Sequence, residues 1–179
     1  SKPCAVRGQI GALCTKRGGA AEEAGIILSD DIDGVMHAGL GEDEEGKFSR
    51  LPLFWKLLRA RPEIDVVISS SWRAISTQDE LVYLFTVNGG EDLIPRFIGQ
   101  TPRQRSERGR YIAGPVYVRY TEIAIWLCEH GKGRPWIALD DDARQFPPGC
   151  ENLLLVDSKT GLQQKDVDEA LRRLARVWH

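Results

Sequence analysis

The strongest constraint on the fold is a repeated pattern, in which short apolar segments run directly into polar or acidic residues. Residues 26–30 (IILSD) lead into Asp31 and Asp33. Residues 65–69 (DVVIS) are followed by two further serines, and residues 135–139 (PWIAL) are followed by three aspartates. Short apolar runs of this kind are typical of buried strands. Helical patterns separate them, which favours a parallel sheet covered by helices on both faces.

The spacing of apolar residues predicts helices between and after these strands. One apolar stripe begins at Leu51, and Pro52 suits the first turn of a helix there. Thr77 and Glu80 have the spacing of a capping box, and two glycines end the apolar stripe that follows. The expected helices are Leu51–Ala60, a segment after Thr77, Thr121–Glu129 and Asp166–Trp178, and a further strand is expected at Asn152–Val156.

These elements predict an α/β fold with three layers, in which a central, mostly parallel sheet of Rossmann-like type carries helices on both faces. We expect residues 25–179 to form this single domain. Residues 1–24 contain four glycines and little apolar periodicity, so we expect a loosely ordered leader.

Composition narrows the classes of protein that remain. The chain has 179 residues, 42% hydrophobic and 28% charged, which is enough for one domain with a hydrophobic core. The formal net charge of −2 argues against a broad surface for polyanions. No apolar run approaches the roughly 20 residues that span a bilayer, so no membrane partner is expected. The four cysteines form no CxxC pair, and we interpret them as free thiols of a cytoplasmic protein.

The strand ends suggest a metal site. In an open parallel sheet, ligands bind at the carboxyl ends of the strands. If the three strands are neighbours, three polar groups converge there: the aspartates after the first strand, Ser69–Ser71 and Asp140–Asp142. Carboxylates this close repel one another and lose solvation, and a bound cation relieves both effects. Mg²⁺ favours carboxylate, water and phosphate oxygens, so the pattern predicts magnesium beside a phosphate group.

Each motif taken alone also fits a purely structural role. An aspartate after a strand is often a turn residue or a helix cap. A run of serines often caps a helix, and three aspartates often form a solvated turn. The functional interpretation therefore depends on their joint occurrence at three strand ends of one short chain.

The same three segments resemble the motifs of the haloacid dehalogenase (HAD) superfamily of aspartate-dependent phosphotransferases. Residues 31–37 (DIDGVMH) resemble its first motif, residues 66–73 (VVISSSWR) its second and residues 138–142 (ALDDD) its fourth. Within the superfamily, the chain is most similar to small bacterial HAD-domain proteins grouped with RNA-repair HAD modules, over roughly residues 26–175. The segments that carry this closer resemblance are SSWR (70–73), RYTEI (119–123), LDD (139–141) and VDSKTGL (156–162).

The resemblance implies a Mg²⁺-dependent hydrolase of phosphomonoesters, a phosphatase that works through an aspartyl-phosphate. Asp31 would be the nucleophile, and Asp33 would be the general acid and then the general base. The metal would be held by Asp31, by the backbone carbonyl of Asp33, and by Asp140 or Asp141.

The resemblance also implies residues that bind the phosphoryl group. Ser70 would donate a hydrogen bond to a phosphoryl oxygen, with Ser69 as the alternative. Arg119 is our choice for the basic residue of the third motif, with Arg103 and Arg110 as rivals. Further contacts with the substrate are expected from Gly34, Ser69 and Ser71.

Two side chains beside the first motif are open to two interpretations each. Asp30 stands where the superfamily more usually has an apolar residue, and it either changes the local charge or faces solvent. His37 is either a substrate contact or a surface residue.

Substrate choice in the superfamily depends on cap insertions, and only residues 38–50 separate the first motif from the first helix here. The resemblance therefore implies minimal or no cap and an open site. The Arg-rich segment 101–111 either contacts a nucleic-acid backbone or is a solvated loop. The expected partner is a phosphorylated small molecule, with a nucleic-acid end as the alternative. The alternative function is a phosphate- or nucleotide-binding or nucleic-acid end-processing module with little general phosphatase activity.

Overall fold

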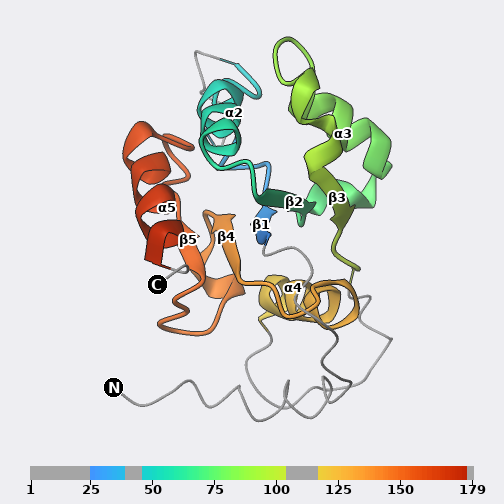
Figure 1. Ribbon diagram of the computed structural model, residues 1–179, viewed down its shortest axis with the longest axis vertical. Helices are drawn as coiled ribbons and strands as arrows, with labels where there is room; N and C mark the ends of the chain where they lie inside the picture. Colours follow the sequence, from blue (N-terminus) through green and yellow to red (C-terminus); the bar gives the residue numbers. More distant parts are fainter. Residues whose placement is uncertain (1–24, 39–45, 104–116, 177–179) are drawn as a thin grey trace.

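The computed structural model describes residues 25–38, 46–103 and 117–176 (Figure 1). The expected leader, residues 1–24, lies outside the described residues. The strands are β1 (Ile26–Asp30), β2 (Ile64–Ile68), β3 (Phe97–Gln100), β4 (Trp136–Asp140) and β5 (Leu153–Leu155). The helices are α2 (Leu51–Ala60), α3 (Gln78–Thr86), α4 (Val118–His130) and α5 (Gln164–Arg176). Short 3₁₀ turns are η1 (Ser71–Ala74), η2 (Glu91–Arg96) and η3 (Ala143–Gln145).

The five strands form one parallel sheet in the order β3-β2-β1-β4-β5. The central strand β1 pairs with β2 on one side, where Asp30 is opposite Ile68. It pairs with β4 on the other side, where Asp30 is opposite Leu139. The segments that follow β1, β2 and β4 therefore leave the sheet side by side. The predicted α/β class and parallel sheet are confirmed.

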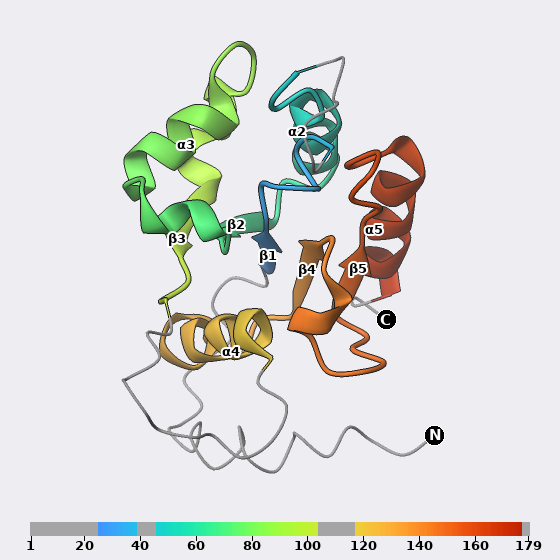
Figure 2. The same ribbon diagram turned by 180° about the vertical axis from the view of Figure 1, so that it is seen from behind.

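The sheet has helices on both faces, which gives three layers. Figures 1 and 2 show α2, α3 and α5 on one side of the strands and α4 on the other. Successive side chains of β1 point to opposite faces of the sheet, so each face has its own hydrophobic core. Ile26 and Leu28 pack into the cluster that includes α2 and α5, whereas Ile27 packs with Trp126 of α4. Because both faces of the sheet are covered, its strands are apolar on both sides.

Some helices begin and end at the predicted residues, and others do not. Leu51–Ala60 is as predicted, and Thr77 and Glu80 form the predicted capping box of α3. Helix α4 begins at Val118, three residues before the predicted Thr121. Helix α5 begins at Gln164, so Asp166 is a residue of its first turn, and its carboxylate accepts a hydrogen bond from Gln163 N at 2.8 Å.

The strand bounds differ more, and one strand was not predicted. The segments predicted at 65–69, 135–139 and 152–156 are found at Ile64–Ile68, Trp136–Asp140 and Leu153–Leu155. Strand β3 has only four residues and contains Gly99, so its apolar pattern is weak. A Cβ atom at Gly99 would lie 3.1 Å from Trp126 Nε1, which explains a glycine within this strand.

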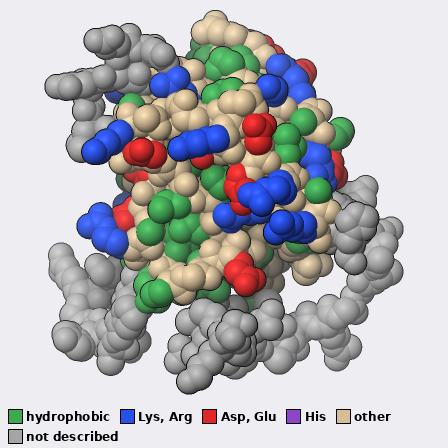
Figure 3. Space-filling view, turned by 90° about the vertical axis from the view of Figure 1, so that its left-hand side faces the viewer, with side chains coloured by type: hydrophobic (Ala, Val, Ile, Leu, Met, Phe, Trp, Pro, Cys, Tyr) green, Lys and Arg blue, Asp and Glu red, His purple; other side chains and the backbone are tan. Residues whose placement is uncertain are grey.

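The outward face of α5 is highly charged. Figure 3, which views the molecule from the side of α5, shows Lys and Arg side chains interspersed with Asp and Glu. Arg173 pairs with Glu169 one turn earlier at 2.6 Å, and Arg172 also pairs with Glu169. Among the described residues, no helix has the length and apolar character needed to cross a bilayer.

Candidate active site

The first carboxylate of the site follows the central strand directly. Asp31 is the residue after β1, and it is buried with 6% of its surface exposed. Its Oδ1 accepts a hydrogen bond from the backbone N–H of Ile32 at 2.7 Å. The backbone N–H of Asp31 itself donates to Leu139 O at 3.2 Å, so the turn is still attached to β4. The carboxylate is therefore fixed at the carboxyl edge of the sheet.

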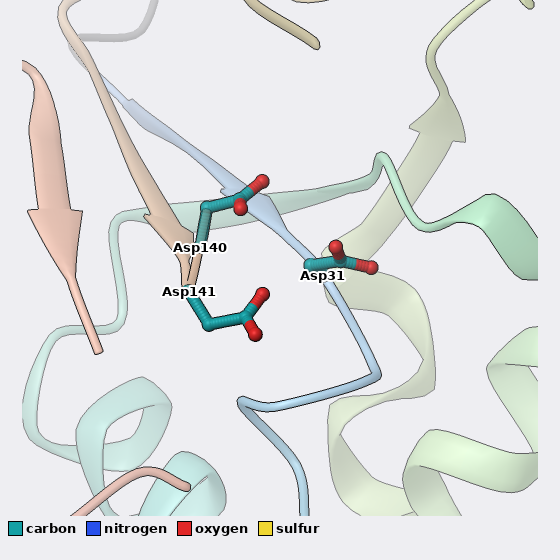
Figure 4. Close-up of side chains that lie close together, drawn as sticks. All are labelled: Asp31, Asp140 and Asp141. Atoms are coloured by element: carbon teal, nitrogen blue, oxygen red, sulfur yellow. The ribbon is translucent and has the colours of Figure 1, made fainter. Parts of the chain in front are cut away.

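Two further carboxylates come from the neighbouring strand. Asp140 is the last residue of β4 and Asp141 follows it. Asp31, Asp140 and Asp141 each offer one oxygen, and these three oxygens lie within 4.8 Å of one another. Figure 4 shows the three carboxylates gathered at the ends of the two strands. The third aspartate of the run, Asp142, instead caps η3 and pairs with Arg144 at 2.8 Å.

An arginine from α4, the helix that covers the other face of the sheet from α2, α3 and α5, contacts two of these carboxylates. Arg119, in the first turn of α4, donates from Nη2 to Asp31 Oδ2 at 2.9 Å. Its Nε lies 3.2 Å from Asp140 Oδ2, close enough for an ion pair, although neither atom makes a hydrogen bond. Of its two rivals, Arg103 lies in a different groove, and Arg110 lies outside the described residues.

Burial and mutual repulsion change the acidity of the cluster. Burial, and then the charge of Asp31, raises the pKa of Asp140 to about 7. The same two causes raise the pKa of Asp141. Asp30 is fully buried, neither of its carboxylate oxygens has a hydrogen-bond partner, and burial raises its pKa well above the usual range. The interpretation of Asp30 as a solvent-facing residue is therefore wrong.

The donor set fits a hard divalent cation. Three carboxylate oxygens converge, and Asp140 Oδ2 lacks a hydrogen bond although it is buried. Buried carboxylates without donors are unfavourable unless a cation or a proton compensates them. Asp31, Asp140 and Asp141 could therefore hold Mg²⁺, which favours oxygen ligands of this kind.

Gly34 is required by the close packing of the first motif against the fourth. Its φ is +70°, a left-handed conformation that favours glycine. A Cβ atom at this position would clash with the carboxylate of Asp141. The turn after β1 therefore packs closely against Asp141 of the acidic cluster, by which we mean Asp31, Asp140 and Asp141. Gly34 thus lies against a carboxylate that we expect to bind metal.

The carboxylate of Asp33 lies outside the cluster of three. Its side chain is 52% exposed, and Trp72 Nε1 donates to its Oδ2 at 2.9 Å. His37 Nε2 lies 3.4 Å from its Oδ1. His37 has only 8% of its surface exposed, so the interpretation of this histidine as a surface residue is wrong. The expected metal contact of Asp33 uses its backbone carbonyl and remains a prediction.

The three serines after β2 have different surroundings. Ser69 is buried, and its hydroxyl accepts a hydrogen bond from Ser29 Oγ at 2.9 Å. Ser70 is fully buried, and its Oγ accepts from Trp72 N at 3.3 Å, which caps η1. Ser71 lines the same cavity as Asp31. The substrate contact of Ser71 stays a prediction, for which its place on the cavity wall leaves room, whereas Ser69 and Ser70 are engaged within the protein.

The cavity beside the carboxylates has a volume of about 530 Å³. It includes three residues that the sequence analysis did not assign to the site, namely Arg144, Gln145 and Ser158. Ser158 belongs to the VDSKTGL segment that follows β5, so the closer resemblance contained a signal for it. Arg144 and Gln145 follow the acidic run in η3 and carry no comparable signal.

A buried arginine joins the strand ends to α4. Arg73 donates to the backbone carbonyls of Ser69 at 2.9 Å and Ser70 at 2.6 Å, and also to that of Thr101 after β3. It pairs with Glu122 of α4 at 2.7 Å, and the two side chains are 3% and 6% exposed. Glu122 and Arg119 are three residues apart and so share a face of α4. The pair thereby fixes the helix that carries Arg119.

Comparison with known proteins agrees with this geometry. The model of a family described as "HAD domain in Swiss Army Knife RNA repair proteins" matches residues 26–167. The match spans β1 to the first turn of α5 and includes all the residues of the acidic cluster. No curated protein and no solved structure matches the chain in the corresponding comparisons.

Proposed function

Because the chain belongs to the family of HAD domains found in Swiss Army Knife RNA repair proteins, we propose that it is a Mg²⁺-dependent phosphomonoester hydrolase with Asp31 as nucleophile. The observation that carries the proposal is the meeting of Asp31 with Asp140 and Asp141, whose oxygens lie within 4.8 Å of one another. If these aspartates served only as turn residues or helix caps, nothing would require their carboxylates to converge in this way. The catalytic domain would comprise residues 25–179.

The proposed reaction has two halves. In the first, a carboxylate oxygen of Asp31 attacks phosphorus, the bond to the leaving oxygen breaks, and Asp33 gives that oxygen a proton. In the second, Asp33 takes a proton from water, the water oxygen attacks phosphorus, and the bond to Asp31 breaks. Inorganic phosphate leaves, and both carboxyl groups return to their starting states.

Other residues would bind the phosphoryl group. Arg119 already contacts Asp31 at 2.9 Å, so its guanidinium is within reach of oxygens on a phosphorus bonded to Asp31. Ser71 is exposed on the wall of the cavity, and we assign it a hydrogen bond to the phosphoryl group. Ser70, with Ser69 as the alternative, would do the same after a change of hydroxyl orientation, and Gly34 would line the turn beneath the group.

Mg²⁺ would be held by Asp31, by Asp140 or Asp141, and by the backbone carbonyl of Asp33. When bound, it would supply the positive charge that reduces repulsion between an anionic nucleophile and an anionic phosphate. This requirement gives the first experiment. The purified protein should release phosphate from an aryl phosphate in Mg²⁺ and stop in EDTA, and Asp31→Asn should abolish release while the circular dichroism spectrum stays unchanged.

A nucleic-acid end is the second candidate substrate, and two observations favour it. The family description refers to RNA repair proteins. A second groove, of about 700 Å³, is lined by Arg73 and by other basic side chains that include Arg103, Lys132 and Arg134. Arg73 of this groove follows Ser71 of the acidic cavity by two residues, so a nucleic-acid strand whose end lies in the cavity would extend its backbone phosphates toward the groove.

Rates on two classes of substrate would separate the candidates. An RNA- or DNA-end phosphatase should act faster on a phosphorylated oligonucleotide than on the matching mononucleotide, and charge reversal at Lys132 should reduce that preference. Equal rates would favour a small-molecule phosphatase. Metal-dependent binding of phosphate esters without release of phosphate would favour a binding module with little turnover.

A further inference from the structure

The carboxylate of Asp33 is contacted at both oxygens, by Trp72 from a distant part of the chain and by His37 four residues further on. Trp72 Nε1, from η1, donates to Oδ2 at 2.9 Å, and His37 Nε2 lies 3.4 Å from Oδ1. The Asp33 side chain is 52% exposed. An exposed carboxylate without such anchors would sample several rotamers in water. The anchors select one of them.

The indole ring that anchors Asp33 is itself held in place. It meets Phe48 edge-on, with ring centroids 5.6 Å apart and planes at 80°. His37 packs against both rings, at 5.7 Å from Phe48 and 6.5 Å from Trp72. Lys47 Nζ lies 5.7 Å from the centroid of the Trp72 ring. We call His37, Phe48 and Trp72 the aromatic cluster. Its members come from three separate segments, so their packing requires the folded core.

We infer that the aromatic cluster, through Trp72, positions Asp33 for proton transfer to the leaving group. The inference rests on the proposed function and goes beyond it, because it assigns a role to residues that would touch neither the phosphorus nor the metal. Asp33 follows Asp31 by two residues, so the direction in which the Asp33 carboxylate points depends on the local turn and on its contacts with Trp72 and His37. Trp72 is thus a positioning residue that acts through Asp33, not a catalytic residue.

A positioning role for the proton donor has a specific kinetic signature. Proton transfer matters most when the leaving oxygen is a strong base, as in alkyl phosphates, and least when it is a weak base, as in p-nitrophenyl phosphate. Loss of the Trp72 N–H should therefore lower kcat/KM for alkyl esters and spare kcat/KM for the aryl ester, since this ratio excludes the second half of the reaction, in which Asp33 acts as a base on every substrate. A general loss of folding would slow both equally.

Trp72→Phe is the direct test, because it keeps an aromatic ring and removes only the N–H donor. We expect kcat/KM, which reports only the steps through departure of the leaving group, to fall about tenfold for glycerol 2-phosphate and to stay within about twofold for p-nitrophenyl phosphate. In an Asp33→Asn background, Trp72→Phe should lower the alkyl rate by no more than about twofold, because the group it positions is already lost.

Trp55→Phe is the matched control. Trp55 Nε1 donates to Phe85 O at 2.8 Å, so this variant also loses a donated indole hydrogen bond, but at α2. Its ratio of alkyl to aryl rates should equal that of the wild type. An unchanged ratio in Trp72→Phe, with an active wild type, would overturn the inference alone. A wild type that hydrolyses neither ester would overturn the proposed function and the inference with it.

Discussion

Arg119 and Asp31 form an ion pair at 2.9 Å between α4 and the end of β1. The same guanidinium lies 3.2 Å from Asp140, so one cation spans carboxylates from two neighbouring strands. This arrangement offsets part of the repulsion within the acidic cluster. It also brings a positive group to the place where the phosphoryl group would be transferred.

Replacement of Arg119 should therefore affect catalysis strongly. We expect Arg119→Ala to lower kcat by about 10²- to 10³-fold, because the charge that would stabilise the transferring group is lost. Arg119→Lys should recover part of this loss, since it restores the charge without the two-pronged geometry. Steady-state kinetics with an aryl phosphate would measure both. The control is Arg172→Ala, whose exposed arginine pairs with Glu169 of α5 outside the cavity, and a loss of equal size there would contradict the assignment.

Substitution of Gly34 should disturb the acidic cluster itself. Gly34→Ala places a methyl group against the carboxylate of Asp141 and adds about 1–2 kcal/mol of left-handed strain. We expect weaker binding of Mg²⁺, so that a higher Mg²⁺ concentration is needed for half-maximal activity, and lower turnover. Gly133 has a similar φ of +76° with nothing within 4 Å of a built Cβ atom, so Gly133→Ala tests strain alone. If both variants lose activity equally, contact with Asp141 is not the cause.

The buried pair of Arg73 and Glu122 should matter for stability. Removal of one partner leaves the other charge buried, and we expect Arg73→Ala to lower the free energy of unfolding by about 3–5 kcal/mol. Urea denaturation would measure the change. Arg59→Ala, which breaks an exposed ion pair with Asp92, should have a much smaller effect. Similar midpoints for the two variants would mean that the buried pair contributes little.

The raised pKa of Asp140 predicts how stability depends on pH without metal. Its pKa is about 7 in the folded chain and about 3.9 in an unfolded one, so the folded state binds the proton more tightly. Stability in EDTA should therefore fall as the pH rises from about 4 to about 7. Thermal unfolding would measure this slope, and Asp140→Asn should flatten it. A slope that does not change in the variant would show that Asp140 is not the group responsible.

Metal should reverse that trend, because Mg²⁺ binds the deprotonated carboxylates. We expect MgCl₂ at about 10 mM to raise Tm more at pH 8 than at pH 5. This concentration is chosen to exceed a moderate dissociation constant about a hundredfold. Asp140→Asn and Asp141→Asn should each reduce the increase. An equal increase at both pH values would argue against carboxylate ligands.

Much of the fold could be predicted from the sequence, because local patterns determined it. Ile26–Asp30 and Leu51–Ala60 have the predicted bounds, since a fully buried strand and an amphipathic helix both leave clear periodicity. Strand β3 was missed because its four residues gain their structure from pairing with β2, which no local pattern records. The start of α5 was placed too late because Asp166 and Glu169 also have the spacing of a capping box, whereas the Asp166 carboxylate accepts a hydrogen bond from Gln163 N in the preceding turn.

The site could be predicted in outline but not in its contacts. Convergence of Asp31 with Asp140 and Asp141 follows from parallel strands that end at one edge, so the sequence was sufficient. The hydrogen bond between Trp72 and Asp33 joins residues 39 positions apart, and no spacing rule predicts it. The surroundings of Ser69 and Ser70 likewise depend on side-chain packing in the folded chain.

The central claim is that Asp31 accepts a phosphoryl group beside a metal held by the acidic cluster. A crystal structure with Mg²⁺ and trifluoroberyllate, which mimics an acyl phosphate, tests it most directly. We predict beryllium bonded to an Asp31 oxygen, with Mg²⁺ at about 2.0–2.1 Å from oxygens of Asp31 and of Asp140 or Asp141. Trifluoroberyllate on another residue, or Mg²⁺ bound away from these three aspartates, would contradict the claim.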